Sequence, residues 1–372
     1  MSYSWRPKLQ QRPTISRLGW CVRGVVLCLL SSMLLYANDN VAQDTLQRAM
    51  SREQPSETLC FTAAAPSDRT RWSDYLRLKY RAWAWFDQLE VDPVELLKHG
   101  IKGTKKLAEI LQAYLNLYQH APDAAARERI QQRVVQLARH TQRFEYHHNM
   151  LVSPDTEFLQ NSMSYLRVLW LLDQLEQDTT AYRQQLLTVK PRMDEHLKQR
   201  GPWQQAMFAE YYTRFGLEKP PGLSLASVGV VIQRLPLTQY NRDKAYHLTH
   251  EVFVAFDYGL RRMQSHFTAE DLSYIRAVLP VLAQAAIQQN AQDLLAEFLQ
   301  CMTYLGWQTE PVYCQGINYL LDSQNPNGTW GNYEALRTVD EPYFDQRLYL
   351  HTTMVAMQAL SEAYEGRWPL SE

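Results

Sequence analysis

Two histidines and an aspartate share one side of an expected helix near the middle of the chain. His247 and His250 are three residues apart, and Asp257 follows seven residues after His250. In a helix over residues 241–260 this spacing places all three on one stripe among apolar neighbours. Imidazole and carboxylate groups in a wet position can hold a metal ion or move protons. The alternative is a structural histidine pair that hydrogen-bonds across neighbouring helices.

Two further side chains of the metal-binding type stand near the beginnings of expected helices. Cys314 comes just after Glu310-Pro311, a helix-start signal, and a helix dipole there favours a thiolate. The alternative for Cys314 is a small buried apolar residue. His351 begins the apolar run HTTMVAMQAL. Both residues are therefore candidates for a shared site with His250.

A third group of candidates is acidic and lies in an irregular stretch between two expected helices. It consists of Glu334, Asp340, Glu341 and Asp345. A carboxylate pair there, or Asp257, could perform general acid and base catalysis. The alternative is that these acids are surface residues that favour solubility.

The composition indicates that helices position these side chains. Of the 372 residues, 46% are apolar and 21% are charged, and there are only 14 glycines and 17 prolines. This balance supports a large core and argues against a turn-rich β architecture. Apolar residues recur at helical spacing almost continuously from Arg69 onward. Among the predicted helices are a single long one over residues 123–148 and a short one over residues 224–234.

The predicted helices alternate between two kinds. Helices with broad apolar faces, over residues 159–175, 245–260, 312–321 and 351–360, alternate with more charged ones over 123–148, 179–199 and 268–289. A ring of inner helices covered by outer helices would produce this alternation. The sequence therefore predicts an all-α domain over residues 67–372, built as a complete or incomplete ring of helical hairpins.

One short motif carries a resemblance that supports this architecture. Gln324, Gly328 and Trp330 form the pattern QxxxGxW. It resembles the QW motif of triterpene cyclases and of related α/α toroids such as prenyltransferase β subunits. The resemblance implies that Gln caps backbone groups, Gly permits a left-handed exit, and Trp fills the gap between helical hairpins. It implies a toroid fold and no cyclisation, because the catalytic DxDD motif of those cyclases is absent from the chain.

A second resemblance covers the C-terminal part of the chain. The segments 246–253, 257–259 and 351–353 are similar to an uncharacterised bacterial family with LTHxxF, D[FY]G and HTT signatures. This similarity implies no reaction.

The toroid resemblance also brings a metal hypothesis. Inner helices of such a ring run parallel, so that His250, Cys314 and His351 would meet at one mouth of the ring. A His/Cys/His set with an open position suits catalytic zinc, and His247 or Asp257 could be a fourth ligand or an orienting residue. Cys314 and His351 are similar in position to zinc ligands of prenyltransferase β subunits. The aspartate expected two residues before that cysteine is Val312 in this chain.

The N-terminus has the features of an export signal. Five basic residues without an acid precede an apolar run of 14 residues, from Gly24 to Ala37. Residues 1–37 are therefore expected to be a signal peptide or an N-terminal anchor to the inner membrane, and residues 38–66 a flexible spacer. Removal of the five basic residues makes the net charge more negative than the −1 of the full chain. Nucleic-acid binding is not expected, and membrane contact is expected only through the N-terminal segment.

Cysteine usage fits an oxidising compartment without requiring it. Beyond the first 37 residues the chain keeps Cys60, Cys301 and Cys314. These allow one disulfide and leave at least one free thiol or metal ligand.

Two classes of function remain open from the sequence. One is an exported enzyme, with or without a metal ion, that has its site at the mouth of a ring. The other is a non-catalytic envelope protein, periplasmic or secreted, that binds a small molecule, a peptide or a partner through a concave helical surface.

Overall fold

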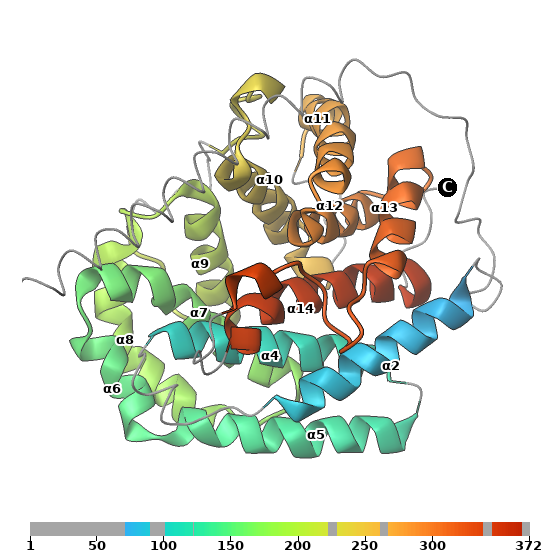
Figure 1. Cartoon of the computed structure of the whole chain (residues 1–372). Coiled ribbons are helices and arrows are strands. Elements are labelled where there is room, and N and C mark those ends of the chain that lie inside the picture. The colour runs from blue at the N-terminus through green and yellow to red at the C-terminus, as the bar shows by residue number, and fades with distance from the viewer. Residues whose placement is uncertain are drawn as a thin grey trace, which may run out of the picture.

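A computed structural model describes residues 71–89, 101–121, 123–221, 229–260, 267–337 and 344–366. Within these ranges every regular element is helical (Figure 1), which confirms the all-α prediction. The α-helices are α2 (Trp72–Gln88), α4 (Ile101–Gln119), α5 (Ala124–Ala138), α6 (Phe144–Val152), α7 (Asp155–Gln174), α8 (Thr180–Leu197), α9 (Pro202–Arg214), α10 (Arg242–Ala255), α11 (Ala269–Gln288), α12 (Gln292–Tyr304), α13 (Pro311–Asp322) and α14 (Phe344–Glu365). Short 3₁₀ turns are η2 (Arg139–Gln142), η3 (Leu237–Gln239), η4 (Asp257–Gly259) and η5 (Glu334–Leu336).

Six of these helices contact one another in the order of the sequence, and we call them the six-helix series. Helix α4 packs against α7, α7 against α9, α9 against α10, α10 against α12, and α12 against α14. Helix α14 also packs against α4, beside which it runs across the middle of the molecule in Figure 1. The last member of the series therefore contacts the first.

Side-chain contacts show that neighbouring helices in the series run in the same direction. Between α12 and α14, Gln300 donates to the Val355 carbonyl, and further along both helices Gln358 donates to the Tyr304 hydroxyl. Between α10 and α12, the Tyr246 hydroxyl reaches Asp293, while Phe253 meets Tyr304 at a ring separation of 6.0 Å. Contacts that advance together along two helices require a parallel pair. The beginnings of these helices consequently lie at the same end of the molecule.

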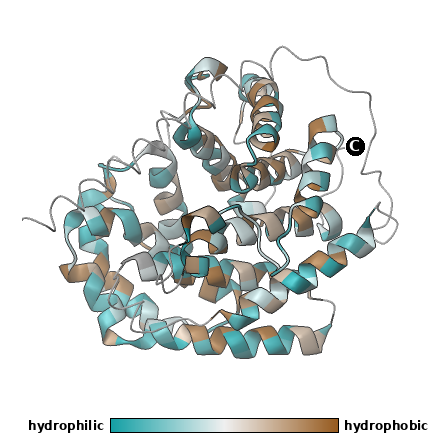
Figure 2. Ribbon diagram, viewed as in Figure 1, coloured by the Kyte–Doolittle hydropathy of each residue, from teal (hydrophilic) through white to brown (hydrophobic). Residues whose placement is uncertain are grey.

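The remaining helices cover the series. Helix α5 packs against α4, α8 against α7, and α11 against α12, while α2 lies against α14. Figure 2 shows prominent teal residues on α2, α5 and α8, whereas every residue of α12 is buried. Covered helices can be apolar on all sides, and covering helices need only one apolar face. Helix α11 is an exception, because it covers α12 and is nevertheless largely apolar, so that the expected alternation of apolar and charged helices is present only in part.

The turn after α13, at residues 324–330, ties α13 to α2. The indole of Trp330 is fully buried, and its Nε1 donates to the Leu320 carbonyl of α13 at 2.8 Å. The Gln324 amide donates to the carbonyls of Leu78 in α2 and of Gly328 at 2.9 and 3.0 Å. Gly328 has a φ of +93°, and a Cβ there would lie 2.5 Å from the Arg81 carbonyl oxygen. The roles expected for the QW-like residues, capping, left-handed exit and filling, are confirmed at this turn.

The single helix expected over residues 123–148 is wrong. The structure divides this segment into α5, η2 and α6. Thr141 is the reason, because its buried hydroxyl donates to the Ala138 carbonyl at 2.7 Å and its own carbonyl lies 2.7 Å from His147 Nε2. Such side-chain bonds compete with the helical backbone pattern.

The short helix expected over residues 224–234 is absent from the part of this segment that the structure describes. Its first part lies outside the described residues, and residues 229–234 form turns. Glu251 of α10 accepts hydrogen bonds from the backbone N–H groups of Val230 and Val231 at 2.7 and 3.1 Å. These N–H groups are therefore paired with a side chain instead of a helical carbonyl.

No helix in the described ranges is long and apolar enough to span a membrane. The expected signal or anchor at residues 1–37 and the spacer at residues 38–66 lie outside the described residues.

Candidate functional site

Three ionisable side chains from three members of the series meet at His351. His351 Nδ1 lies 3.4 Å from Glu109 Oε1 of α4, and His351 Nε2 lies 3.4 Å from Glu297 Oε1 of α12. We call these three residues the His351 cluster. Both separations exceed the 2.7–2.9 Å that is usual, roughly, for a charge-assisted hydrogen bond. His351 Nδ1 has no hydrogen-bond partner among the described residues.

The two carboxylates keep the imidazole charged. Burial by itself lowers the pKa of His351, but Glu109 and Glu297 outweigh that effect and raise the pKa to about 10. Burial likewise raises the pKa of Glu109, and His351 outweighs it, so that this pKa lies below its ordinary value. Near neutral pH the imidazole of His351 is therefore charged, and Glu109 is a carboxylate.

The cluster is deep in the protein but accessible to solvent at the imidazole. The side chain of His351 is 35% exposed, whereas those of Glu109 and Glu297 are 9% and 2% exposed. Burial nevertheless has the largest single influence on the pKa of His351. Solvent therefore reaches the imidazole between two buried carboxylates.

Helix α10 supplies the next contacts. The Thr249 hydroxyl donates to Glu297 Oε2 at 2.5 Å, which orients that carboxylate. His250 Nδ1 donates to the Tyr246 carbonyl at 2.7 Å, and the Trp203 ring of α9 lies 4.5 Å from the His250 ring. Burial lowers the pKa of His250. His250 is therefore a neutral neighbour of the cluster with a specified tautomer.

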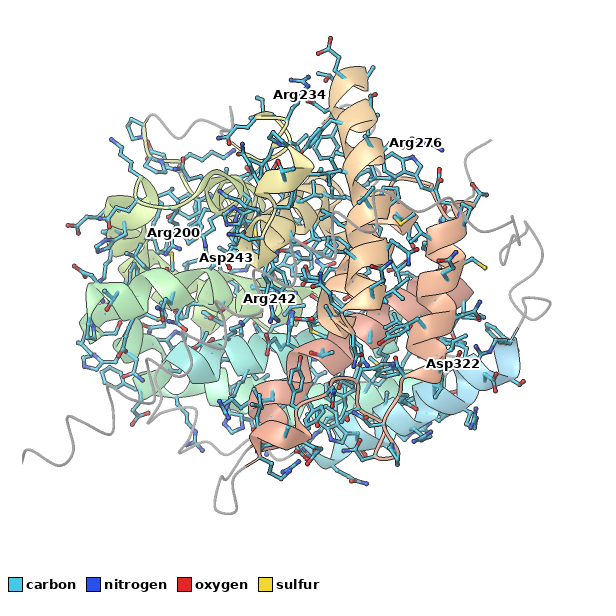
Figure 3. All side chains as sticks on the ribbon, turned by 45° about the horizontal axis from the view of Figure 1, so that its top comes forward. Arg200, Arg234, Arg242, Asp243, Arg276 and Asp322 are labelled. Atoms are coloured by element: carbon cyan, nitrogen blue, oxygen red, sulfur yellow. The ribbon has the colours of Figure 1, made fainter. Side chains whose placement is uncertain are left out.

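A second ionic group lies where α10 and α12 begin. Arg242 donates to Asp293 Oδ2 at 2.7 Å, and the Tyr246 hydroxyl donates to the same oxygen. Burial raises the pKa of Asp293, but Arg242 and Tyr246 outweigh it, and the pKa is lowered. Figure 3 shows Arg242 in the middle of the view, with Arg234 and Arg276 toward the periphery. The Arg242 side chain is 54% exposed, so this pair lies where the surroundings of the cluster meet solvent.

Arg167 of α7 completes the surroundings from the remaining side. Its guanidinium donates to Gln112 of α4 at 3.1 Å and lies 5.0 Å from the centre of the Tyr258 ring. The Arg167 charge acts on both Glu109 and His250. All six helices of the series thus contribute a side chain to this polar region.

The structure assigns different environments to the residues of the zinc hypothesis. His250 and His351 are near enough for the charge of His351 to lower the pKa of His250. Cys314 is disulfide-bonded, and a disulfide sulfur offers no thiolate to a metal. No group of three or more His, Cys, Asp or Glu side chains in the described ranges is arranged to hold a metal ion. The set of His250, Cys314 and His351 stays a prediction from the sequence.

Helix α13, which carries Cys314, was expected to be an inner helix of the ring. It instead contacts α2 and α11 as well as α12 and α14. Its apolar face is buried beneath the covering helices, which is why its composition resembles that of the series. Cys301 of α12 is a free, buried thiol, so the predicted combination of one disulfide and one free cysteine is confirmed.

Asp257 does not extend the His250 stripe as expected, whereas His247 lies beside the same Trp203 ring as His250. Helix α10 ends at Ala255, and Asp257 has a φ of +52° in η4, so the helical spacing is broken before Asp257. Asp257 forms an ion pair with Arg214 of α9. His247 lies on the Trp203 side of α10 at a ring separation of 6.4 Å, and burial lowers its pKa.

Two of the four acidic candidates, Glu334 and Asp345, lie outside the His351 cluster. Glu334 is paired with Arg337 at 2.8 Å, and hydrogen bonds from Arg337 and Tyr349 lower its pKa to about 2. Asp345 is paired with the same arginine at 2.6 Å. A group with so low a pKa is a poor general acid near neutral pH. Asp340 and Glu341 lie outside the described residues.

Sequence reasoning missed Glu109 and Glu297, although a signal was present. Helix α4 contains Glu109, Gln112 and Asn116 at spacings of three and four within an apolar run. Helix α12 contains Asp293, Glu297 and Gln300 at spacings of four and three within another. A polar stripe inside a helix that is otherwise apolar must meet polar partners or water. Polar stripes of this kind indicate a polar site between helices, just as histidines do.

Fold and cluster together define a class: an all-helical protein in which distant helices hold a charged histidine between two carboxylates. Residues 79–361 match the family model described as Domain of unknown function (DUF6895), and the chain belongs to this family. No curated protein and no solved structure matches the chain.

Proposed function

We propose that this protein is an exported α/α toroid that binds a small polar ligand at the His351 cluster. The toroid part of the proposal rests on the six-helix series. Its members follow one another in sequence, the contacts described above between neighbours are parallel, and α14 returns to α4. Other helices lie between most successive members along the chain, although no described helix lies between α9 and α10, and a QW-like turn joins α13 to α2. This connectivity supports a ring of helical hairpins.

The observation that carries ligand binding is the state of the His351 imidazole. It is charged, it exposes 35% of its side chain, and its contacts of 3.4 Å are long. A network that served stability alone would gain from shorter bonds and complete pairing. Charged groups that are held apart where solvent reaches them can instead bind polar groups of a ligand. This function corresponds to the non-catalytic class that the sequence left open.

A second candidate function is acid–base catalysis at the same His351 cluster. The observation that favours it is the pair of carboxylates on opposite sides of one imidazole, since such pairs serve hydrolysis and elimination reactions. A histidine whose pKa is about 10 is protonated near neutral pH and cannot accept a proton there. Catalysis would therefore have to use Glu109 or Glu297 as the base, with His351 as an electrostatic partner.

Export is proposed from the N-terminal charge pattern and from Cys314. Five basic residues before an apolar run are the features that a translocon recognises. The disulfide of Cys314 supports an oxidising compartment, because thiols are kept reduced in the cytosol. N-terminal sequencing of the native protein tests this part. A start near Asn38 supports cleavage, an intact Met1 in membranes supports an anchor, and an intact Met1 in the soluble cytoplasm contradicts both.

Ligand binding is tested by thermal unfolding of the native protein against a panel of polar metabolites. A ligand at one hundred times its dissociation constant stabilises the folded state by about 2.7 kcal/mol. The stabilisation should disappear in Glu297→Gln and persist in Glu334→Gln, whose carboxylate belongs to a surface pair. A ligand that stabilises both variants equally does not bind at the cluster, and turnover of that ligand would select the catalytic candidate.

A further inference from the structure

The ion pairs of the His351 cluster share one orientation with respect to solvent. The side chain of His351 is partly exposed, whereas its partners Glu109 and Glu297 are buried. On α4, one turn before Glu109, Lys105 is 66% exposed, and its Nζ lies 3.8 Å from Glu109 Oε1. In each of these pairs the carboxylate is buried and the basic group faces solvent.

The ion pair of Arg242 and Asp293 has the same orientation and is close to His351. The Arg242 side chain is 54% exposed, and that of Asp293 is 7% exposed. The charge of His351 acts on Asp293, which places this pair beside the cluster. Basic groups from α4, α10 and α14 therefore face solvent around the cluster, each with a buried carboxylate behind it.

The beginnings of the helices add to this positive potential. Arg242 is the first residue of α10. Helices α4 and α14 are parallel as well, because Glu109 meets His351 in their first halves and His120 meets Glu365 at their ends. The N-terminal end of a helix carries a partial positive charge, and its effect falls off within about one turn. It therefore favours an anion beside Arg242 more than one beside His351.

This arrangement selects the charge of the ligand. A ligand that arrives from solvent meets an ammonium, an imidazolium and a guanidinium group before it meets the carboxylates of these pairs. Each buried carboxylate holds its basic partner in place without covering the exposed side, which lowers the ordering cost of binding. A guanidinium group binds carboxylate and phosphate groups through two parallel hydrogen bonds. Asp243, the exposed acid next to Arg242 in the sequence, acts on His247.

Two partly buried aromatic rings flank the basic groups. Tyr333 is close enough to act on the charge of Arg242, and its hydroxyl lies 2.8 Å from the hydroxyl of Thr352, the residue after His351. On the other side, the Trp203 ring lies 4.5 Å from the His250 ring. Aromatic faces bury apolar surface of a ligand. They therefore favour an organic anion over a bare inorganic ion.

We propose that the solvent-facing side of the His351 cluster binds a small organic anion through a carboxylate or phosphate group, with His351, Arg242 and Lys105 as its basic contacts. This inference rests on the proposed ligand-binding function and names the class of ligand. The buried carboxylates position the basic groups, and the basic groups meet the ligand.

Isothermal titration calorimetry of the native protein with small organic anions tests the inference. The carboxylate probes are succinate, malate and citrate, and the phosphate probes are glycerol phosphate, ribose phosphate and glucose phosphate. Each anion is paired with an uncharged counterpart, its amide or its unphosphorylated form, and with an amine of similar carbon skeleton. At least one anion should bind saturably, and both of its counterparts should bind at least tenfold more weakly. Binding confined to one set of probes identifies the group as carboxylate or as phosphate.

A matched pair of arginine variants locates the binding. Arg242→Gln should weaken the binding of the anion at least tenfold. The control is Arg276→Gln, because Arg276 is 58% exposed, is also paired with a glutamate, and lies toward the periphery in Figure 3. Its affinity for the anion should equal that of the native protein.

A second pair of variants is independent of the buried acid. Arg242→Gln lowers stability, because it removes the ion-pair partner of Asp293, whereas Lys105 is a highly exposed side chain. Lys105→Glu should weaken the binding at least threefold, and Lys219→Glu, beyond the end of α9, should leave it unchanged. Raising the ionic strength from about 0.05 M to about 0.5 M should weaken the binding as well, because salt screens exposed charges.

The outcomes separate this inference from the proposed function. Equal affinity for the anion in the native protein, Arg242→Gln and Lys105→Glu overturns the inference, as does failure of all the anions to bind. If an uncharged counterpart or an amine binds at least as tightly as its anion and Glu297→Gln abolishes that binding, the ligand class is wrong and the proposed function stands. If the binding persists unchanged in Glu297→Gln, the proposed function fails with the inference.

Discussion

The turn at residues 324–330 and the His351 cluster are both polar structures between buried helices, yet they are paired differently. In the turn, Trp330 and Gln324 donate hydrogen bonds of 2.8–3.0 Å to backbone carbonyls. In the cluster, both contacts of His351 are 3.4 Å long, and its Nδ1 has no hydrogen-bond partner among the residues that the structure describes. The short hydrogen bonds of the turn are typical of a stabilising contact between helices. The long contacts of the cluster are the reason that we propose it as a ligand-binding site.

The largest expected effect is in the turn. Trp330→Ala should lower the free energy of unfolding by about 3–5 kcal/mol, because it leaves a cavity between helices. Urea denaturation followed by circular dichroism measures this. Trp330→Phe should cost less, since an aromatic ring still fills part of the space, although the bond to Leu320 is lost. A loss below 1 kcal/mol for the alanine variant, on the scale of about 1 kcal/mol per ordinary hydrogen bond, would contradict a structural role.

A backbone change in the same turn should have the next largest effect. Gly328→Ala places a Cβ 2.5 Å from the Arg81 carbonyl oxygen at a φ of +93°. The expected cost is about 1–3 kcal/mol from backbone strain alone. The matched control is Gly201→Ala, because no atom lies within 4 Å of the new Cβ and the φ is −64°. Similar melting temperatures for both variants would show that the turn tolerates displacement.

The contribution of the His351 cluster to the free energy of unfolding should depend on pH. Since the pKa of His351 is raised to about 10 in the folded state from 6.5 in the unfolded state, its contribution to stability is complete below pH 6.5. That contribution is lost as the pH rises toward 10. The difference in unfolding free energy between the native protein and His351→Gln should therefore shrink over this interval. A difference that does not change with pH would mean that His351 is not held as an imidazolium.

The smallest expected effect on stability is at Glu109. Glu109→Gln removes one of the two acidic partners of His351 and leaves the pair of His351 and Glu297. The unfolding free energy at pH 7 should change by about 1 kcal/mol or less, while the pKa of His351 falls, as measured by NMR titration. Breaking a buried ion pair costs about 3–5 kcal/mol. A loss of that size would show that the cluster, like the turn, mainly stabilises the fold.

Local patterns in the chain were sufficient for the helices and for the turn. Apolar periodicity identified most helices, and the spacing of Gln324, Gly328 and Trp330 identified the turn, because each of these signals acts over a few neighbouring residues. Thr141 shows where this reasoning failed. Its bonds to Ala138 and His147 divide a segment whose periodicity is continuous.

The site was only partly predictable. His250 and His351 were recognised as members of one region, but their functional neighbours were chosen from residues with familiar metal-binding types. Glu109 and Glu297 are separated from His351 in sequence by more than two hundred and more than fifty residues. Cys314 was included for its place in a helix start, whereas its disulfide and the covering helices remove it from the cluster.

The sequence by itself determined the all-helical class, the alternation of covered and covering helices, and the structural turn, since these follow from local propensity and periodicity. Only the tertiary structure decided which polar stripes face one another. The pKa of His351 depends on carboxylates from α4 and α12 that reach it only when α14 packs against both helices. Because electrostatic interactions act through space, chain position does not reveal them.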